Sequence, residues 1–230
     1  MTKHIGIAAV SPEGAALCYR QIFRQAAHLM GPNNHPRVSL HNEPLVTYIE
    51  AVRANNWHAV GDLLRRSATI LADCGAEFCL SPDNVVQFGI QLAEAGSPIP
   101  WLTMPDLVAR TVEQDQRKIV GLIGTKMVTT ASTYQTHLGL RGIQVLAPEP
   151  AEVDELDRII FTELVYGEIK PKSRQAVAAV IKGLAEKGCE AIILASSEAP
   201  LVVNAETSPL PLYDAADILA RGAVVRAMKV

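Results

Sequence analysis

Short apolar segments alternate along this chain with longer segments that carry the period of an α-helix. The apolar segments are three to six residues long and end in turn-forming or small polar residues, as the first does at Ser11-Pro12. Runs of this length bounded by turn residues are typical of buried strands. The pattern predicts six strands: Ile5 to Val10, Arg37 to His41, Phe78 to Ser81, Ile119 to Ile123, Gln144 to Leu146 and Ala191 to Ala195.

The segments between these strands place apolar residues three and four positions apart, which is the spacing of one helix face. Strands that alternate with helices are typical of an α/β fold with parallel sheets. The expected helices are Pro12 to Leu29, Leu45 to Ala51, Trp57 to Cys74, Asn84 to Ala95, Leu107 to Gln114, Thr129 to Leu138, Val153 to Val165, Ser173 to Lys187 and Ala215 to Met228.

The chain also repeats itself. Residues 75–84 parallel residues 188–197, and residues 99–110 parallel residues 210–221, at separations of 113 and 111 positions. A repeat of this length is large enough to be a small domain. We therefore expect two pseudo-symmetric, Rossmann-like α/β lobes, each with a parallel sheet flanked by helices.

The repeats bring two polar residues into equivalent positions. Asp83 stands eight positions after Gly75, and Ser196 stands eight positions after Gly188. Ligands of open α/β sheets bind beyond the carboxyl ends of the strands, so a cleft between the lobes is the expected site. The structural alternative is that Asp83 and Ser196 are N-caps of the helices that follow, since Asp and Ser favour that position.

Composition narrows the function classes. The chain has 21 Lys and Arg residues against 24 Asp and Glu residues, a formal charge of −3 and no basic run, which argues against nucleic acid and an anionic membrane surface as partners. Its apolar stretches are shorter than the roughly 20 residues of a membrane-spanning helix, and Met1-Thr2-Lys3-His4 does not resemble a signal peptide. A cytoplasmic protein with a small-molecule partner is expected.

Metal and thiol chemistry are not indicated by the spacing of candidate ligands. The four cysteines form no C-x-x-C pair, and the six histidines are scattered without metal-ligand spacing. Buried, inert thiols are the expected state of Cys18, Cys74, Cys79 and Cys189.

Several segments together resemble the aspartate/glutamate racemase family, which includes amino-acid racemases, hydantoin racemases, maleate isomerases and arylmalonate decarboxylases. Pro82-Asp83-Asn84-Val85 is similar to the first catalytic motif, usually Pro-Cys-Asn-Thr, and the segment from Ile193 to Leu201 is similar to the second, usually centred on Gly-Cys-Thr-Glu. The resemblance is closest to the aspartate racemase branch. Its other segments are residues 5–7, 11–13, 75–78, 123–125, 159–164, 167 and 173–174.

The resemblance implies a fold and an assembly. It implies a homodimer of two-lobed chains, with the helix after Asp214 completing the first lobe and the helix after Thr103 belonging to the second. We expect a first lobe of residues 1–100 plus 212–230, a second of residues 101–211, and an active site in the cleft between them.

The resemblance also implies chemistry without a cofactor. Family members that racemise use two cysteines to remove the α-proton from one face of the substrate and return a proton to the other. Asp83 and Ser196 stand at these two positions, so they are the expected catalytic residues. Ser11, Asn84, Thr125, Lys170, Ser197 and Glu198 are the expected substrate-binding residues, and no metal ligand or cofactor is expected.

Three functions remain open. The first is a cofactor-independent isomerase or lyase that does acid/base chemistry beside the carboxylate of a small acid, with Asp83 as the main acid/base group and Ser196 as a donor. The second is an aspartate or glutamate racemase with an atypical second base. The third is a catalytically inactive carboxylate-binding protein. For Lys170 the alternative is an exposed loop lysine, and for Glu198 it is an acid favoured by a helix dipole.

Overall fold

The computed structural model describes residues 2–229. The chain divides into two compact units, one built from the residues up to Met104 and from Ala216 onward, the other from Pro105 to Ala215. Each unit holds a four-stranded parallel sheet flanked by helices, and this confirms the α/β fold predicted from the pattern of apolar segments.

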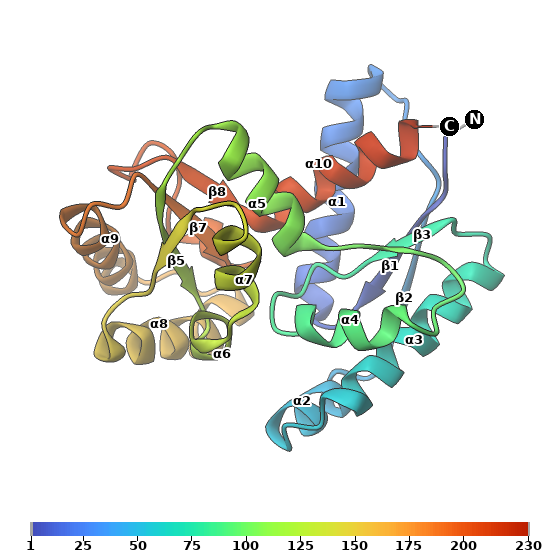
Figure 1. Ribbon diagram of the computed structural model, residues 1–230, viewed down its shortest axis with the longest axis horizontal. Coiled ribbons are helices and arrows are strands. Elements are labelled where there is room, and N and C mark those ends of the chain that lie inside the picture. Colours follow the sequence, from blue (N-terminus) through green and yellow to red (C-terminus); the bar gives the residue numbers. More distant parts are fainter. Residues whose placement is uncertain (1, 230) are drawn as a thin grey trace. The chain divides into compact units, whose positions relative to one another are not determined.

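The first unit arranges its strands in the order β2-β1-β3-β4 (Figure 1). Helices α1 and α10 lie together and are joined by hydrogen bonds from Gln25 to Asp217 (2.9 and 3.0 Å), while α3 packs against α4 and on β1. Its strands are β1 (Ile5–Ala9), β2 (Val38–Asn42), β3 (Phe78–Leu80) and β4 (Trp101–Leu102), and its helices are α1 (Pro12–Met30), α2 (Leu45–Arg53), α3 (Trp57–Asp73), α4 (Gln87–Glu94) and α10 (Ala215–Met228), apart from its first residue.

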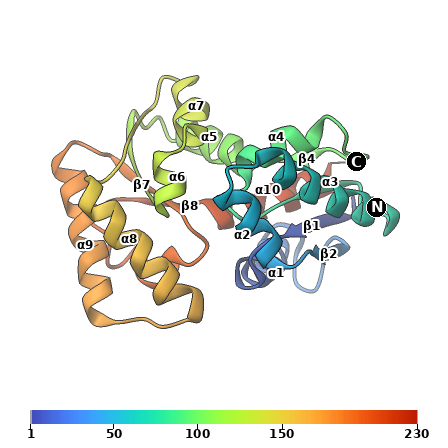
Figure 2. The same cartoon turned by 90° about the horizontal axis from the view of Figure 1, so that it is seen from below.

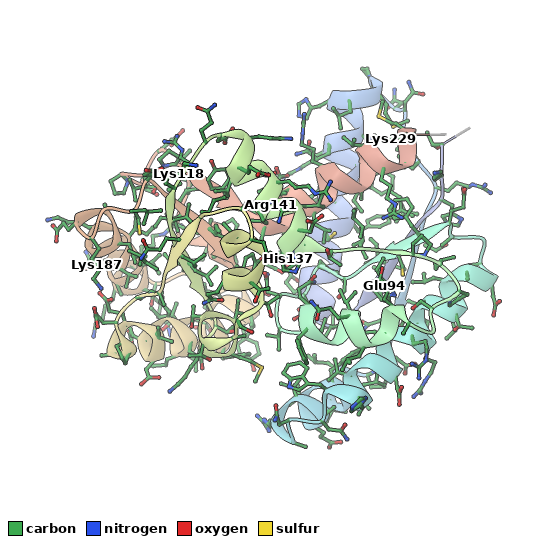
Figure 3. The ribbon with its side chains drawn as sticks, in the orientation of Figure 1. Glu94, Lys118, His137, Arg141, Lys187 and Lys229 are labelled. Atoms are coloured by element: carbon green, nitrogen blue, oxygen red, sulfur yellow. The ribbon has the colours of Figure 1, made fainter. Side chains whose placement is uncertain are left out.

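The second unit repeats this order as β6-β5-β7-β8. Helices α8 and α9 lie side by side (Figure 2). Lys187, labelled in Figure 3, directly follows α9, and its ammonium group lies 2.5 Å from the carboxylate of Glu149, which directly precedes α8. The two helices therefore run in opposite directions. Its strands are β5 (Ile119–Gly124), β6 (Gln144–Leu146), β7 (Ala191–Ala195) and β8 (Leu212–Asp214), and its helices are α5 (Met104–Gln114, apart from its first residue), α6 (Lys126–Thr130), α7 (Thr133–Gly139), α8 (Pro150–Thr162) and α9 (Pro171–Glu186), with 3-10 turns η1 (Leu164–Tyr166) and η2 (Ala199–Leu201).

The unit boundaries differ from the expected positions after residues 100 and 211. Strand β4 pairs with β3, and β8 pairs with β7, so both short strands stay with the unit that precedes them in the chain. The units accordingly change after Met104 and after Ala215. The apolar pattern predicted neither β4, which has two residues, nor β8, which has three.

Several expected helices have different bounds, and three of them begin three residues earlier than expected. The helix expected over residues 129–138 is two helices, because Thr125 caps a helix that begins at Lys126 and the extended backbone at Ala131 (ψ 153°) ends it. The helix expected from Val153 begins at Pro150, where a capping box between Glu149 and Glu152 starts it. The helix expected from Leu107 begins at Met104.

Among the residues that the structure describes, no helix is both long enough and apolar enough to cross a membrane.

Candidate functional site

The loops that follow the central strands carry most of the predicted site residues. In a parallel sheet these loops all leave from the carboxyl edge. Ser11 follows β1, and Asp83 and Asn84 follow β3 in the first unit. Thr125 follows β5, and Ser196, Ser197 and Glu198 follow β7 in the second unit. Each unit therefore presents its own set of polar residues at one sheet edge.

The carboxylate of Asp83 is held by its own loop. Its Oδ1 accepts a hydrogen bond from the backbone N–H of Val85 at 2.9 Å, and the side chain is half-buried. Helix α4 begins only at Gln87 and its N-cap is Val86. The interpretation of Asp83 as a helix N-cap is therefore wrong, and so is the helix start at Asn84. The turn fixes one oxygen of the carboxylate beside β3.

Gln87 is a site residue that the sequence analysis missed. It is 3% exposed, and its amide Nε2 donates to the carbonyl oxygens of Ser81 (3.0 Å) and Asp83 (2.9 Å). Its Oε1 accepts from the backbone N–H of Met104 at 3.2 Å. This side chain thus sets the path of the loop that carries Asp83. A glutamine near the start of an expected helix gives no signal of such a role.

Tyr48 was also missed. It is 1% exposed, and burial raises the pKa of its hydroxyl to about 12, with the Ser67 hydroxyl acting in the opposite direction and the Glu43 and Asp83 carboxylates raising it further. At neutral pH the side chain is therefore a neutral phenol that feels the charge of Asp83.

Ser11 is a helix cap. Its Oγ accepts from the backbone N–H of Gly14 at 3.1 Å, at the start of α1. Asn84, next to Asp83, is buried. Both lie at the carboxyl edge of the first unit's sheet, as expected from the strand order.

Register places Thr125 beside Ser196. Gly124 and Ala195 are partners in the ladder between β5 and β7, and the two polar residues follow them directly. Thr125 caps α6 through a hydrogen bond from the backbone N–H of Val128 to its Oγ1 at 3.4 Å. The two side chains are 7% and 6% exposed, so the hydroxyls lie in a buried setting.

Ser196 and Glu198 form a buried pair. The Ser196 Oγ donates a hydrogen bond to Oε2 of Glu198 at 2.8 Å, and the backbone N–H of Glu198 donates to Ser196 Oγ at 3.3 Å. Glu198 is 7% exposed. The interpretation of Ser196 as a helix N-cap is wrong, because only the three-residue turn η2 follows and its N-cap is Glu198. Half-buried Ser197 lies between the two on the same loop.

Gly124 allows the close approach that this register needs. A Cβ at this position would lie 2.8 Å from the carbonyl oxygen of Ala195. We expect Gly124→Ala to lower the free energy of unfolding by about 1–3 kcal/mol, the cost of overpacking a tight site, as measured by urea unfolding followed by circular dichroism. Gly139→Ala is the matched control, because a Cβ there meets nothing within 4 Å. An equal loss of stability in both variants would contradict the packing argument.

Lys170 lies on the segment between α8 and α9. Its side chain is 55% exposed, and Nζ is 3.7 Å from Oε1 of Glu163 and 3.5 Å from Oε2 of Glu168. The exposure agrees with the interpretation of a loop lysine. The sequence pattern does not predict the buried carboxylate of Glu163, since two of its partners, Ser173 and Lys170, lie beyond the helix that ends before it.

Cys18, Cys79 and Cys189 are buried as expected, but Cys74 is exposed, because it follows the last residue of α3, so the expectation of a buried thiol is wrong there. Burial raises the pKa of the Cys79 and Cys189 thiols. Residues 2–229 contain no group of three or more His, Cys, Asp or Glu side chains placed to hold a metal ion. The loops after β3 and β7 carry the carboxylates of Asp83 and Glu198 and the hydroxyl of Ser196.

Comparison with known proteins shows a family and related structures. The model of the family described as Asp/Glu/Hydantoin racemase matches residues 7–223. The structure is similar to that of a candidate Asp/Glu racemase from Yersinia pestis, with 28% identity, a TM-score of 0.91 and coverage of 99% of this chain and 100% of the other. It is also similar to an aspartate racemase homologue from Pyrococcus horikoshii OT3, with 25% identity, a TM-score of 0.88 and full coverage of both chains. The aspartate racemase of Picrophilus torridus, at 20% identity and a TM-score of 0.77 over 98% of this chain and 94% of the other, shares the fold.

Proposed function

Because the chain belongs to the Asp/Glu/hydantoin racemase family, we propose that it catalyses cofactor-independent proton transfer at the carbon next to the carboxylate of a small acid. The observation that carries this proposal is the buried hydrogen bond between Ser196 and Glu198. A lone serine hydroxyl is too weak a base to remove a carbon-bound proton. A serine that donates a hydrogen bond to a carboxylate can transfer its own proton to that carboxylate while it accepts another.

The second acid/base group in the proposal is Asp83. Its carboxylate is anchored by the N–H of Val85, so the base is held in one orientation before the substrate binds. An ionised carboxylate can remove a proton, and the carboxyl that results can return one. Asp83 takes the position of the first family cysteine.

The Ser196–Glu198 pair takes the position of the second cysteine as a relay. As Ser196 Oγ accepts a proton from the substrate carbon, its own proton moves along the existing 2.8 Å hydrogen bond to the carboxylate of Glu198. In the reverse direction Glu198 gives that proton back to Ser196, which delivers its own to the carbon. No cofactor enters this exchange, and the number of protons is conserved.

The charge that develops on the substrate carboxylate needs hydrogen-bond donors placed in advance. The Thr125 hydroxyl lies next to Ser196 by register, and it is the proposed donor in the second unit. Asn84 and Ser11 are the proposed polar contacts in the first unit, with Ser197 and Lys170 as further binding groups. Donors of this kind serve isomerisation, decarboxylation and elimination equally well.

Racemisation of an amino acid is the second candidate function. Inversion needs a proton donor or acceptor for each face of the carbon. Asp83 and the Ser196–Glu198 pair, on the equivalent loops after β3 and β7, offer two such groups. If only Asp83 exchanges protons and Ser196 acts as a donor, the reaction is one-sided.

Proton NMR in D₂O tests the proposal. The purified protein is incubated with L- and D-aspartate, both glutamates, maleate, malate and a substituted malonate, and α-proton exchange, chirality and new signals are followed. We expect exchange or a new product with at least one of these acids. Exchange with inversion supports two acid/base groups, whereas exchange without inversion or a new product supports one-sided chemistry through Asp83.

Binding without turnover would contradict the proposal. The same acids are therefore titrated by calorimetry against the wild-type protein. Tight binding of an acid that shows neither exchange nor product would identify a carboxylate-binding protein instead.

A further inference from the structure

The buried carboxylate of Glu163 contacts several residues in and around the segment between α8 and α9. Glu163 is 2% exposed, and its Oε2 accepts from Ser173 Oγ at 2.5 Å. Its Oε1 accepts from Arg158 at 2.9 Å and lies 3.7 Å from Nζ of Lys170. The side chain therefore connects the end of α8, the connecting segment and the first turn of α9.

The main chain of Glu163 holds the same segment. Its carbonyl oxygen accepts from the backbone N–H groups of Tyr166 and Glu168 at 3.1 and 3.0 Å. Gly167, in the left-handed conformation (φ 72°), lets the chain turn at this point. The segment that leads to Lys170 is thus defined by one residue through both its backbone and its carboxylate.

Glu163 is ionised in this setting. The hydrogen bond from Ser173 is the main cause that lowers the pKa of Glu163, and Arg158 and Lys170 lower it further, against the opposing effect of burial. A buried charge is costly unless it is paired and hydrogen-bonded. The three partners meet that requirement, so the negative charge has a fixed position.

Lys170 has two acidic neighbours, and only one of them holds its carboxylate in a fixed position. The Glu163 side chain is 3% exposed and held by two hydrogen bonds, whereas the Glu168 side chain is 59% exposed. Both distances to Nζ, 3.7 and 3.5 Å, are longer than the roughly 2.7–2.9 Å of a charge-assisted hydrogen bond. The ammonium group therefore keeps the capacity to bind a further carboxylate.

We infer that Glu163 is a positioning residue for Lys170: its buried carboxylate places the ammonium group for the carboxylate of a ligand, and exposed Glu168 does not. The role of Lys170 towards substrate rests on the proposed function. The coupling between Glu163 and Lys170 belongs to this unit alone and can be tested without a substrate.

The first experiment observes Lys170 directly. The lysines of the full chain are methylated reductively with ¹³C, and the signal of Lys170 is assigned by its loss in Lys170→Arg. We expect Glu163→Gln to move this signal and Glu168→Gln, the matched control with the same chemical change, to move it less. An unmoved signal in Glu163→Gln, or an equal movement in both variants, would overturn the inference.

A second variant covers the case in which Glu163→Gln does not fold. Ser173→Ala removes the 2.5 Å contact without changing any charge. Circular dichroism checks that it is folded, and its Lys170 signal is expected to move, because the carboxylate loses its tether. A folded Ser173→Ala protein with an unchanged Lys170 signal would count against the positioning role.

The second experiment uses an acid that the wild-type protein converts. Glu163→Gln is expected to raise KM by about 2- to 150-fold, the range of pairwise couplings between contacting residues, with little change in kcat. Glu168→Gln is expected to leave KM within about two-fold. In a Lys170→Met background Glu163→Gln should have no further effect on KM, and a full additive effect there would refute the coupling.

The two experiments separate the inference from the proposed function. If no acid is converted but the Lys170 signal moves only in Glu163→Gln, the positioning role stands and the enzymatic function fails. If the acids are converted but the signal does not move, the enzymatic function stands and the positioning role is wrong.

Discussion

Replacement of Asp83 by asparagine is expected to reduce kcat by about 100- to 10,000-fold, the usual contribution of a general acid or base. Asparagine keeps the shape of the side chain, and its Oδ1 can still accept from the N–H of Val85, which now binds the carboxylate at 2.9 Å. The turn is therefore expected to persist while the basicity is lost. Turnover is measured by NMR or a chiral assay, and affinity by calorimetry.

The expected signature is a loss of turnover with affinity changed by less than about three-fold. Asp73→Asn is the matched control, since Asp73 is an exposed carboxylate at the end of α3 in the same unit. Unchanged turnover in Asp83→Asn would remove Asp83 from the mechanism. A parallel loss of affinity and turnover would instead assign it to substrate binding.

Disruption of the Ser196–Glu198 pair is expected to have the second large effect. Ser196→Ala should reduce kcat by about 100- to 10,000-fold, because in the relay Ser196 exchanges the proton with the substrate carbon. A serine that only donates to the developing charge would cost about 10- to 1,000-fold. Glu198→Gln should reduce it by about 100- to 10,000-fold if Glu198 takes up the relayed proton. Glutamine can still accept the hydrogen bond from Ser196, so the loop geometry is expected to be preserved.

The relay also predicts the effect on kcat of replacing Ser196 and Glu198 together. Residues that act as a unit do not have additive effects on kcat. Ser196→Ala combined with Glu198→Gln is thus expected to cost no more than the larger single change. Effects that multiply would show that the two side chains act independently, which would rule out the relay.

Exposed residues of the same unit provide the controls. Ser132→Ala and Glu206→Gln make the same chemical changes at exposed positions. Both are expected to keep kcat within about two-fold of wild type, as surface substitutions usually do. Losses in these variants comparable to those at Ser196 and Glu198 would point to instability rather than chemistry.

The periodic pattern of apolar residues was sufficient to predict the architecture. The repeat at 111 and 113 positions corresponds to two sheets with the same order of parallel strands. Asp83 and Ser196 occupy loops after equivalent strands, β3 and β7, because the spacing from the preceding glycines is the same in both copies. Local periodicity and loop chemistry act over a few residues, so they can be recognised in the sequence.

The tertiary structure alone decided which side chains meet. Whether Glu198 turns towards Ser196 or towards a helix start depends on the course of the loop after β7, where only a three-residue turn follows. The position of Asp83 depends on Gln87, whose amide bonds two carbonyls of the preceding loop.

The order of residues in the chain therefore determined the two sheets and the loops at their carboxyl edges. Only the folded packing decided that Ser196 donates to Glu198 and that Glu163 is buried against Ser173 and Arg158. The physical reason is that strands and helices follow from a repeated local preference, whereas a buried charge takes its partners from whichever neighbours packing brings within hydrogen-bond distance.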